Sequence, residues 1–265
     1  LLNPETELYN EDEKGNIAPY KPILTHTQNY LWDQYTKSLA EFEHIAGKDK
    51  IIFLHTGDLT HGNKHPDTLV SNRISDQILI GKSNLDPIYR IKNLQAVRII
   101  LGTAAHNFGL GSAELVISKH LEELHPKHDT KAMYHDHMTI DGCITDVAHH
   151  GPYPGSRVWL DGNVARYYLR DMIMREAMDG KQPPNMVLRG HYHRYILESL
   201  RHKKEWHYLT VMPAMCFLGD YTHQAARSPD RVTTGLLAYE IINGKVGEIY
   251  DHMIETNDIR TKETL

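Results

Sequence analysis

The chain has 265 residues, of which 40% are hydrophobic and 24% are charged, and its formal net charge is -5 at pH 7. This length is enough for one large α/β domain with a sizeable core, or for two small domains. The acidic balance argues against a protein that holds nucleic acid mainly through a basic surface. It does not exclude a phosphate substrate, because bound cations would reverse the local electric field.

Membrane and secreted classes are also disfavoured. No apolar run approaches the roughly 20 residues that a helix needs to span a bilayer, so we expect no membrane partner. The first ten residues lack the basic-then-apolar pattern of a signal peptide. The two cysteines, Cys143 and Cys216, lie far apart and match no paired metal or redox spacing. We therefore expect a reducing compartment, the cytoplasm.

The first half of the chain alternates between strand and helix patterns. Residues 1–24 are polar, contain three prolines, and are expected to form an irregular arm. Apolar positions at helical spacing predict a helix over 27–45. A short β-branched run predicts a buried strand over 50–54. A helix is expected over much of 67–83, and a second buried strand over 96–101.

Hairpins become more frequent in the second half. A serine cap with a downstream glutamate predicts a helix over 112–124. Strands are predicted over 132–139 and 143–148, and the Asp141-Gly142 dipeptide between them is a strong signal for a two-residue turn.

The remaining elements are a helix over 161–178, a strand over 185–189 and a second hairpin turn at Asn243-Gly244. We therefore expect a mixed α/β fold in which helices flank two packed mixed β-sheets. No linker or repeat divides the chain, so a single domain over 1–265 is expected.

Four short polar clusters each follow an apolar, strand-like run. Ligands of open α/β sheets gather at the carboxyl ends of the strands, so we expect these clusters to converge. The chain also contains 19 histidines, a residue type suited to metal binding and to proton transfer near neutral pH. The four clusters are 57–62 (GDLTHG), 102–107 (GTAAHN), 149–152 (HHGP) and 190–193 (GHYH).

The residue types in these clusters favour a metal site. A His-x-His pair such as His191 and His193 can supply one ligand to each of two adjacent ions, and Asp58 suits a bridging carboxylate. Imidazole and carboxylate ligands favour zinc, manganese or iron over calcium. Two cations roughly 3.5–4 Å apart can clamp the attacking and leaving oxygens of a phosphate ester. We therefore expect two divalent metal ions and a phosphate-ester substrate.

The order of the motifs resembles the calcineurin-like metallophosphoesterase superfamily, in particular its bacterial and phage-borne members. These motifs are Gly-Asp, then a Gly-to-His cluster, then His-His-Gly-Pro, then Gly-His-x-His, and they cover about residues 50–193. The resemblance implies a sandwich of two mixed sheets with a dinuclear site at one edge. It also implies that Asp58 bridges the metals, and that His191 and His193 each ligate one ion.

The third cluster contributes one ligand in this resemblance, either His149 or His150. Histidine followed by Gly-Pro is a frequent family form, which favours His150. Adjacent residues of an extended chain point to opposite sides, so only one of the two histidines is expected to face the metals.

Two departures from the family pattern stand out. The superfamily usually opens with an Asp-x-His motif at the end of its first strand, and nothing before Lys50 matches it. We expect this motif upstream of Leu1, which would leave one metal position without two of its ligands. The usual Gly-Asn-His motif is replaced by 102–106 (GTAAH). In this variant His106 would be the proton donor to the leaving group or a metal ligand, and Asn107 could replace the missing amide.

Two arginines are candidate phosphate contacts, Arg157 and Arg189, because a guanidinium can bind phosphate bidentately. An ordinary salt bridge is an equal alternative for each. The sequence leaves open a phosphodiesterase, a DNA nuclease within that class, or a domain that binds metal or serves as a scaffold without efficient catalysis. A metallo-β-lactamase-type enzyme would need a His-x-His-x-Asp-His cluster, which the sequence lacks. The oligomeric state does not follow from these residues.

Overall fold

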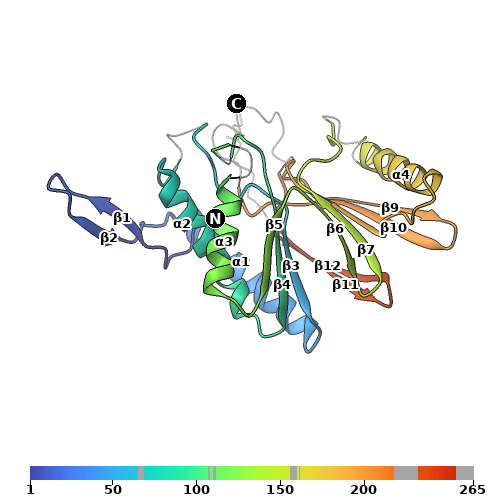
Figure 1. Cartoon of the computed structure of the whole chain (residues 1–265), viewed down its shortest axis with the longest axis horizontal. Coiled ribbons are helices and arrows are strands. Elements are labelled where there is room, and N and C mark those ends of the chain that lie inside the picture. The colour runs from blue at the N-terminus through green and yellow to red at the C-terminus, as the bar shows by residue number, and fades with distance from the viewer. Residues whose placement is uncertain are drawn as a thin grey trace, which may run out of the picture. The chain divides into compact units, whose positions relative to one another are not determined.

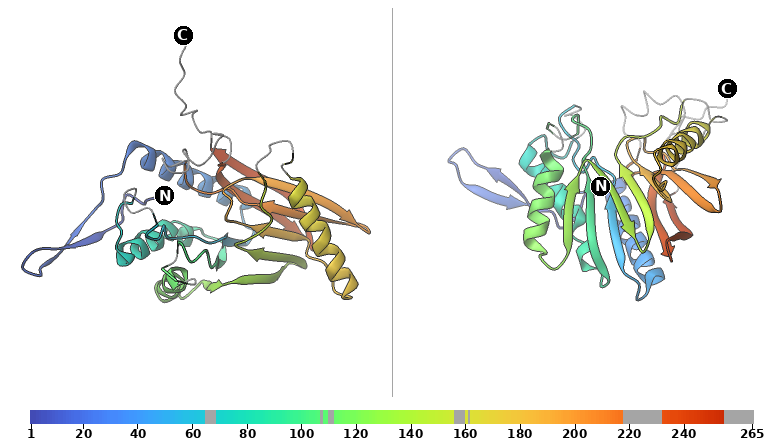
Figure 2. Two further views of the ribbon diagram at one scale, coloured as in Figure 1. Left: turned by 90° about the horizontal axis from the view of Figure 1, so that it is seen from above. Right: turned by 45° about the vertical axis from the view of Figure 1, so that its right-hand side comes forward.

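A computed structural model describes residues 1–64, 69–106, 108–109, 112–155, 160, 162–217 and 232–254. The chain forms two compact units, Leu1–His135 and Asp136–Leu265, referred to below as unit 1 and unit 2 (Figures 1 and 2). Across the described ranges, no helix is both long and apolar enough to cross a bilayer.

Unit 1 is built on a parallel sheet of three strands, in the order β3-β4-β5. Parallel neighbours need crossover connections, which here carry helices. Helix α3 packs against β5, β4 and α2. The elements are β1 (Leu8–Glu11), β2 (Ile17–Tyr20), α1 (His26–Ala46), β3 (Ile51–His55), α2 (Ile74–Leu85), the 3-10 helix η2 (Ile88–Arg90), β4 (Leu94–Ile100), α3 (Ser112–Leu124) and β5 (Asp129–Met133).

Helix α1 confirms the helix predicted over 27–45. It begins at a capping box, in which Thr25 Oγ1 accepts a hydrogen bond from Gln28 N at 3.2 Å and Gln28 Oε1 accepts one from Thr25 N at 2.8 Å. These two bonds satisfy donors that would otherwise be left open at a helix start. The helix ends at Gly47, whose φ of 57° is readily adopted by glycine.

The expectation of an irregular arm over 1–24 is wrong for its central part, which is the antiparallel hairpin β1–β2. Asp12 closes the turn, because its Oδ1 accepts hydrogen bonds from the backbone N of both Lys14 and Asn16 at 2.8 Å. Pro19 is compatible with this hairpin, since both strands are edge strands and proline is tolerated there. The hairpin extends away from the helices of its own unit (Figure 1).

Unit 2 contains a mixed sheet of five strands in the order β6-β7-β8-β10-β9. Strands β7, β8 and β10 are mutually parallel, and β9 is antiparallel to β10. Helix α4 packs against β9 and β10 (Figure 1). The elements are β6 (His135–Ile140), β7 (Cys143–Ala148), α4 (Asn163–Met178), β8 (Met186–Arg189), β9 (Ile196–His202), β10 (Glu205–Val211), β11 (Thr234–Ile242) and β12 (Lys245–Ile254).

Both predicted hairpin turns of unit 2 are confirmed. Asp141 and Gly142 have φ values of 44° and 84°, and Asn243 and Gly244 have values of 49° and 78°. Two consecutive positive φ values are typical of the tight turns that match the twist of paired strands. The two turns also contact each other, because Asn243 N donates a hydrogen bond to Asp141 Oδ2 at 2.8 Å.

The predicted strand over 132–139 is divided at Tyr134. Its first part lies in β5 of unit 1, and its second part lies in β6, in a different sheet. No proline or glycine marks this bend, so the local pattern reads as one continuous strand. The mixed α/β class is confirmed. The packing of two sheets into a sandwich and the single domain over 1–265 stay predictions.

Candidate metal centre

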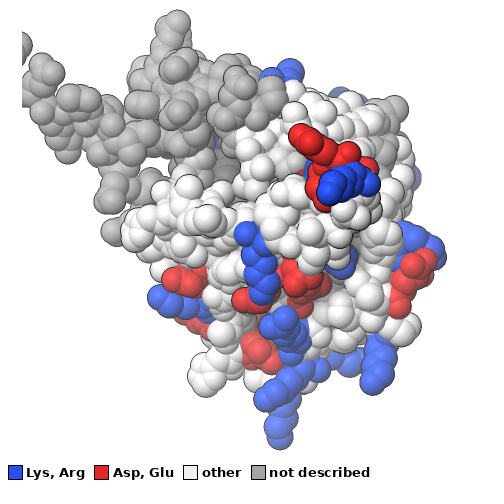
Figure 3. Space-filling view, turned by 90° about the vertical axis from the view of Figure 1, so that its left-hand side faces the viewer, with Lys and Arg blue, Asp and Glu red and all other residues white. Residues whose placement is uncertain are grey.

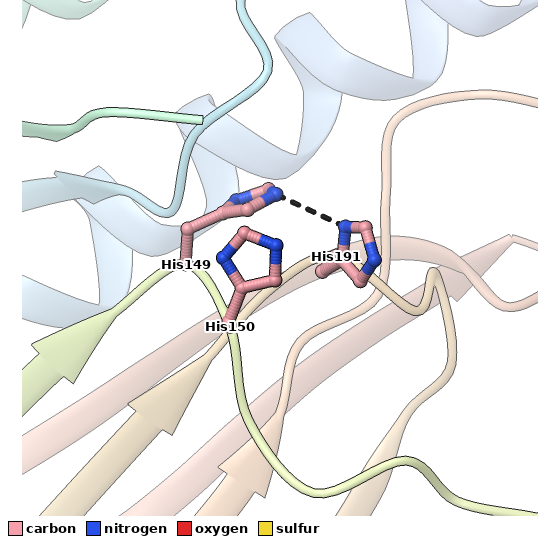
Figure 4. Close-up of side chains that lie close together, drawn as sticks. All are labelled: His149, His150 and His191. Carbon is pink, nitrogen blue, oxygen red and sulfur yellow. Dashed lines mark hydrogen bonds between the residues drawn. The ribbon is translucent and has the colours of Figure 1, made fainter. Parts of the chain in front are cut away.

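Three histidines of unit 2 meet just beyond the carboxyl ends of β7 and β8 (Figure 4). His149 and His150 follow β7, and His191 follows β8. One ring nitrogen from each lies within 4.8 Å of the other two. These three residues, called the histidine cluster below, could hold a metal ion.

The closest pair of nitrogens has the spacing of two ligands on one ion. His149 Nε2 and His191 Nδ1 lie 3.2 Å apart and share a hydrogen bond (Figure 4). Zinc–nitrogen bonds of about 2.0–2.1 Å at tetrahedral angles place two nitrogen ligands roughly 3.3 Å apart. The donor set, three imidazoles, suits zinc and other borderline ions rather than calcium. The residues present therefore fit a divalent metal by both spacing and chemistry.

The strand register explains why distant histidines meet. Strands β7 and β8 pair in parallel with Ala148 opposite Arg189, so the segments that follow the two strands leave the sheet at the same level. Gly190 N then donates a hydrogen bond to the carbonyl of His149 at 3.0 Å, which ties the two loops together. The convergence expected for the third and fourth clusters is confirmed within this unit.

The expectation that only one of the adjacent histidines faces the site is wrong. Strand β7 ends at Ala148 and the chain bends at His149, so the alternation of an extended strand no longer applies. The ring centroids of His149 and His150 lie 5.1 Å and 4.6 Å from that of His191. His149 is 3% exposed, whereas His150 is open to solvent.

Three of the predicted ligands have a left-handed backbone. The φ values are 58° at Asp58, 73° at His191 and 51° at His193. For a residue with a Cβ this conformation costs on the order of 1–2 kcal/mol, and it persists where the surrounding structure enforces it. Such residues concentrate at functional sites, so the backbone supports the same positions that the motifs indicated.

His193 faces a different partner from the histidine cluster. Its Nδ1 lies 3.6 Å from the sulfur of Cys216. Burial raises the pKa of the Cys216 thiol, so the thiol keeps its proton at neutral pH and is able to donate it to the imidazole. The sequence did not predict this contact, since no spacing links Cys216 to His193.

In unit 1 the first two polar clusters converge at Asp58. Its Oδ1 accepts hydrogen bonds from Thr103 N at 2.7 Å and from Thr103 Oγ1 at 3.2 Å. A Cβ at Gly102 would lie 2.1 Å from this same oxygen, so only glycine allows the two loops to approach this closely. Thr103, whose role the sequence did not define, therefore orients the predicted bridging carboxylate.

His106 has one ring nitrogen engaged. Its Nδ1 lies 2.9 Å from the carbonyl of His61, and the Thr60 hydroxyl donates a hydrogen bond to the carbonyl of His106. A carbonyl accepts only, so Nδ1 carries the hydrogen and Nε2 is the atom that can bind a metal or transfer a proton. Asn107 lies outside the described residues.

A buried glutamate on α3 supports the Asp58 loop and was not singled out from the sequence. Glu114 is fully buried, and its Oε1 accepts a hydrogen bond from Leu59 N at 3.2 Å. Its Oε2 has no partner within the described part of the chain. Burial raises the pKa of this carboxyl, and the nearby charge of Asp58 raises it further. The sequence offered only one signal, the position of Glu114 in the first turn of a helix.

Arg189 is not available to a phosphate, so its prediction as a substrate contact is wrong. The side chain is 2% exposed, and its Nη2 lies 2.5 Å from Asp146 Oδ1. Its Nη1 donates to the carbonyls of Asp146 and Leu188 at 3.2 Å and 2.9 Å. Arg189 instead forms a buried salt bridge with Asp146, which was the alternative expectation for it. This salt bridge joins β8 to β7. Arg157 lies outside the described residues.

Comparisons with known proteins find no family model and no curated protein that matches this chain. Two solved structures are similar to it at 11% sequence identity each. The Thermus thermophilus sulfate thiohydrolase SoxB in complex with glycerol has a TM-score of 0.37, and the match covers 84% of this chain and 42% of that one. The solution NMR structure of Thermotoga maritima protein TM1076 has a TM-score of 0.33, with 77% and 99% covered. This chain thus spans less than half the length of the SoxB chain.

Proposed function

We propose that this chain is a metal-dependent phosphoesterase that hydrolyses phosphate esters, with phosphodiesters as the first class to consider. The observation that carries the proposal is the histidine cluster, in which His149 and His191 have the nitrogen spacing of two ligands on one ion. The motif order that resembles the calcineurin-like metallophosphoesterases supports the same residues.

The cluster divides into a buried and an open side. His149 is buried and is held by the hydrogen bond from Gly190 to its carbonyl, so it fixes the inner ligand position. His150 is exposed and completes the group on the solvent side, where a phosphate ester could enter. A divalent cation held here would act as a Lewis acid on the phosphoryl oxygen and lower the pKa of a water molecule.

Following the motif order, we propose Asp58 and His193 as further metal ligands. The left-handed backbone at both residues supports this assignment. We propose that His106, with a hydrogen on both ring nitrogens, donates the Nε2 proton to the leaving oxygen and keeps its Nδ1 hydrogen on the carbonyl of His61. Manganese, zinc and iron all suit such ligands.

Nucleic acid is one form that the phosphodiester could take. On the face shown in Figure 3, the Lys and Arg side chains that the structure describes are interspersed with Asp and Glu side chains and do not form a purely basic patch. The net charge of -5 likewise gives a long polyanion no general attraction. We therefore place small phosphodiesters before a DNA nuclease substrate.

A second candidate is a domain that binds metal or serves as a scaffold but catalyses poorly. One observation favours this second candidate. Thr103 donates two hydrogen bonds to Asp58 Oδ1, so one oxygen of the carboxylate expected to bridge the ions already has protein partners. Elemental analysis of the purified protein separates the candidates, because two metals per chain support the enzyme. None or one, without turnover, supports the second candidate.

The test of the main proposal combines metal content with turnover. His149→Ala and His191→Ala each remove one nitrogen of the closest pair, so metal affinity should fall by about tenfold or more. Hydrolysis of bis(p-nitrophenyl) phosphate, measured with added manganese or zinc, should fall with metal content. His137→Ala is the matched control, because His137 is an exposed histidine of the same unit that lies outside the cluster.

Two outcomes would contradict the proposal. One is full metal binding by both cluster variants. The other is a metal-loaded protein that hydrolyses neither bis(p-nitrophenyl) phosphate nor p-nitrophenyl phosphate. The first outcome would remove the histidine cluster as the metal site, and the second would remove phosphoester hydrolysis as the function.

A further inference from the structure

Two tyrosines extend the histidine cluster outward as a row of aromatic rings. Tyr192 follows His191 directly, and their ring centroids lie 4.8 Å apart. Tyr153 follows His150 by three positions, and its ring centroid lies 5.5 Å from that of Tyr192 at an interplanar angle of 60°. All four residues belong to unit 2, so this row is a feature of one compact unit.

Tyr192 is held in place from several sides. Its ring packs against the buried core beneath α4, which includes Leu169, Val187 and Leu209. Its hydroxyl donates a hydrogen bond to the carbonyl of Gly151 at 3.4 Å. Because the core and the carbonyl of Gly151 both restrain Tyr192, its ring has a defined position beside the histidine cluster.

Tyr153 differs from Tyr192 because most of it is open to solvent. The residue is 58% exposed, although its ring makes an edge-to-face contact with the fixed ring of Tyr192. Edge-to-face pairs are favourable by roughly 0.5–1.5 kcal/mol, so Tyr192 orients Tyr153 without covering it. An oriented aromatic face therefore lies in solvent next to residues that we assign to metal binding.

We propose that Tyr153 and Tyr192 form a subsite for a planar aromatic group carried by the phosphodiester substrate. This inference rests on the proposed function, and it names the substrate class as phosphodiesters whose non-leaving group carries an aromatic ring, such as the base of a nucleoside or an aryl group. Stacking on an aromatic side chain suits such groups because every ring presents a π face, whatever its hydrogen-bonding pattern. A methyl group in the non-leaving position has no flat face to offer.

The experiment compares substrates with one leaving group and different second groups. They are thymidine 5′-(p-nitrophenyl phosphate), phenyl p-nitrophenyl phosphate and methyl p-nitrophenyl phosphate. The full chain, loaded with manganese, should show a higher kcat/KM for the first two than for the methyl ester, mainly through a lower KM. Preference for the thymidine ester over the phenyl ester would identify a nucleobase as the natural group, and the reverse would identify an aryl group.

Variants then test the tyrosine. Tyr153→Ala should reduce the ratio of aromatic to methyl ester kcat/KM by roughly 5- to 150-fold, the range expected for loss of one stacking contact. Tyr153→Phe should keep the ratio because it keeps the ring. Tyr167→Ala is the matched control, since Tyr167 is 68% exposed on α4 and lies outside the row.

The outcomes separate this inference from the function on which it rests. If the chain hydrolyses all three esters equally well, or Tyr153→Ala keeps the ratio, the subsite is refuted and the phosphoesterase stands. If the metal-loaded chain hydrolyses none of them, and neither bis(p-nitrophenyl) phosphate nor p-nitrophenyl phosphate, the proposed function is refuted. The subsite is then judged by calorimetric binding of thymidine monophosphate to the metal-loaded protein, where equal affinity of wild type and Tyr153→Ala would overturn it.

Discussion

The buried ion pair between Asp146 and Arg189 gives the sharpest test of how unit 2 is held together. Asp146→Asn keeps the shape of the side chain but removes its charge. The guanidinium is 2% exposed and lies 2.5 Å from the carboxylate, so the variant leaves a positive charge without its counter-ion in the interior. Breaking a buried pair by removing one partner typically costs 3–5 kcal/mol.

The structure places the expected loss at the lower end of this range. Arg189 keeps the hydrogen bonds from Nη1 to two backbone carbonyls in the variant, which offset part of the lost attraction. We therefore expect Asp146→Asn to lower the free energy of unfolding by about 3 kcal/mol. Arg189→Met should cost a similar amount, because it removes the guanidinium that faces the buried carboxylate of Asp146.

The assay is urea-induced unfolding of the wild type, both single variants and the double variant, followed by circular dichroism. The double variant should cost less than the two single variants added together, because the two charges disappear at once. Single losses below about 0.5 kcal/mol, the size typical of an exposed pair, would refute the reasoning. An Arg189→Met protein with wild-type stability and a raised KM would also refute the reasoning. That result would show that Arg189 contacts the substrate.

Three further predictions concern unit 1. Gly102→Ala places a Cβ 2.1 Å from Asp58 Oδ1, and we expect it to lower the free energy of unfolding by about 1–3 kcal/mol; a thermal midpoint equal to that of the wild type would show that the loops do not approach this closely. Glu114→Gln should remove a pH dependence of stability. Burial raises the pKa of the Glu114 carboxyl above 4.5, so the folded state retains a proton that the unfolded state releases. The stability of the wild type should therefore fall as the pH rises from 4.5 toward the folded pKa. Identical urea midpoints for wild type and variant at every pH would contradict this. Asp12→Ala removes the side chain that closes the β1–β2 turn, and hydrogen exchange should accelerate in that hairpin alone; acceleration throughout the unit would show that the hairpin supports the core.

The sequence by itself determined the elements with strong local signals. The two turns at Asp141 and Asn243 depend on glycines and neighbours within a few residues, so their patterns could be read directly, and apolar spacing alone predicted the helix over 27–45. The polar clusters were also identifiable, because a buried strand followed by glycine and histidine stands out against the apolar background. The hairpin β1–β2 was missed, since the three prolines of residues 1–24 suggested irregular chain, whereas its one proline, Pro19, lies in an edge strand that tolerates it.

Only the tertiary structure decided how these clusters are arranged. Parallel pairing of β7 and β8 brings the histidine cluster together, and the bend at His149 turns both adjacent rings toward His191. The burial of Arg189 and the hydrogen bonds of Thr103 to Asp58 likewise depend on strands far apart in the chain. Residue type specifies what chemistry is available, but the distance between two side chains from separate strands is set by register and packing, which no local pattern encodes.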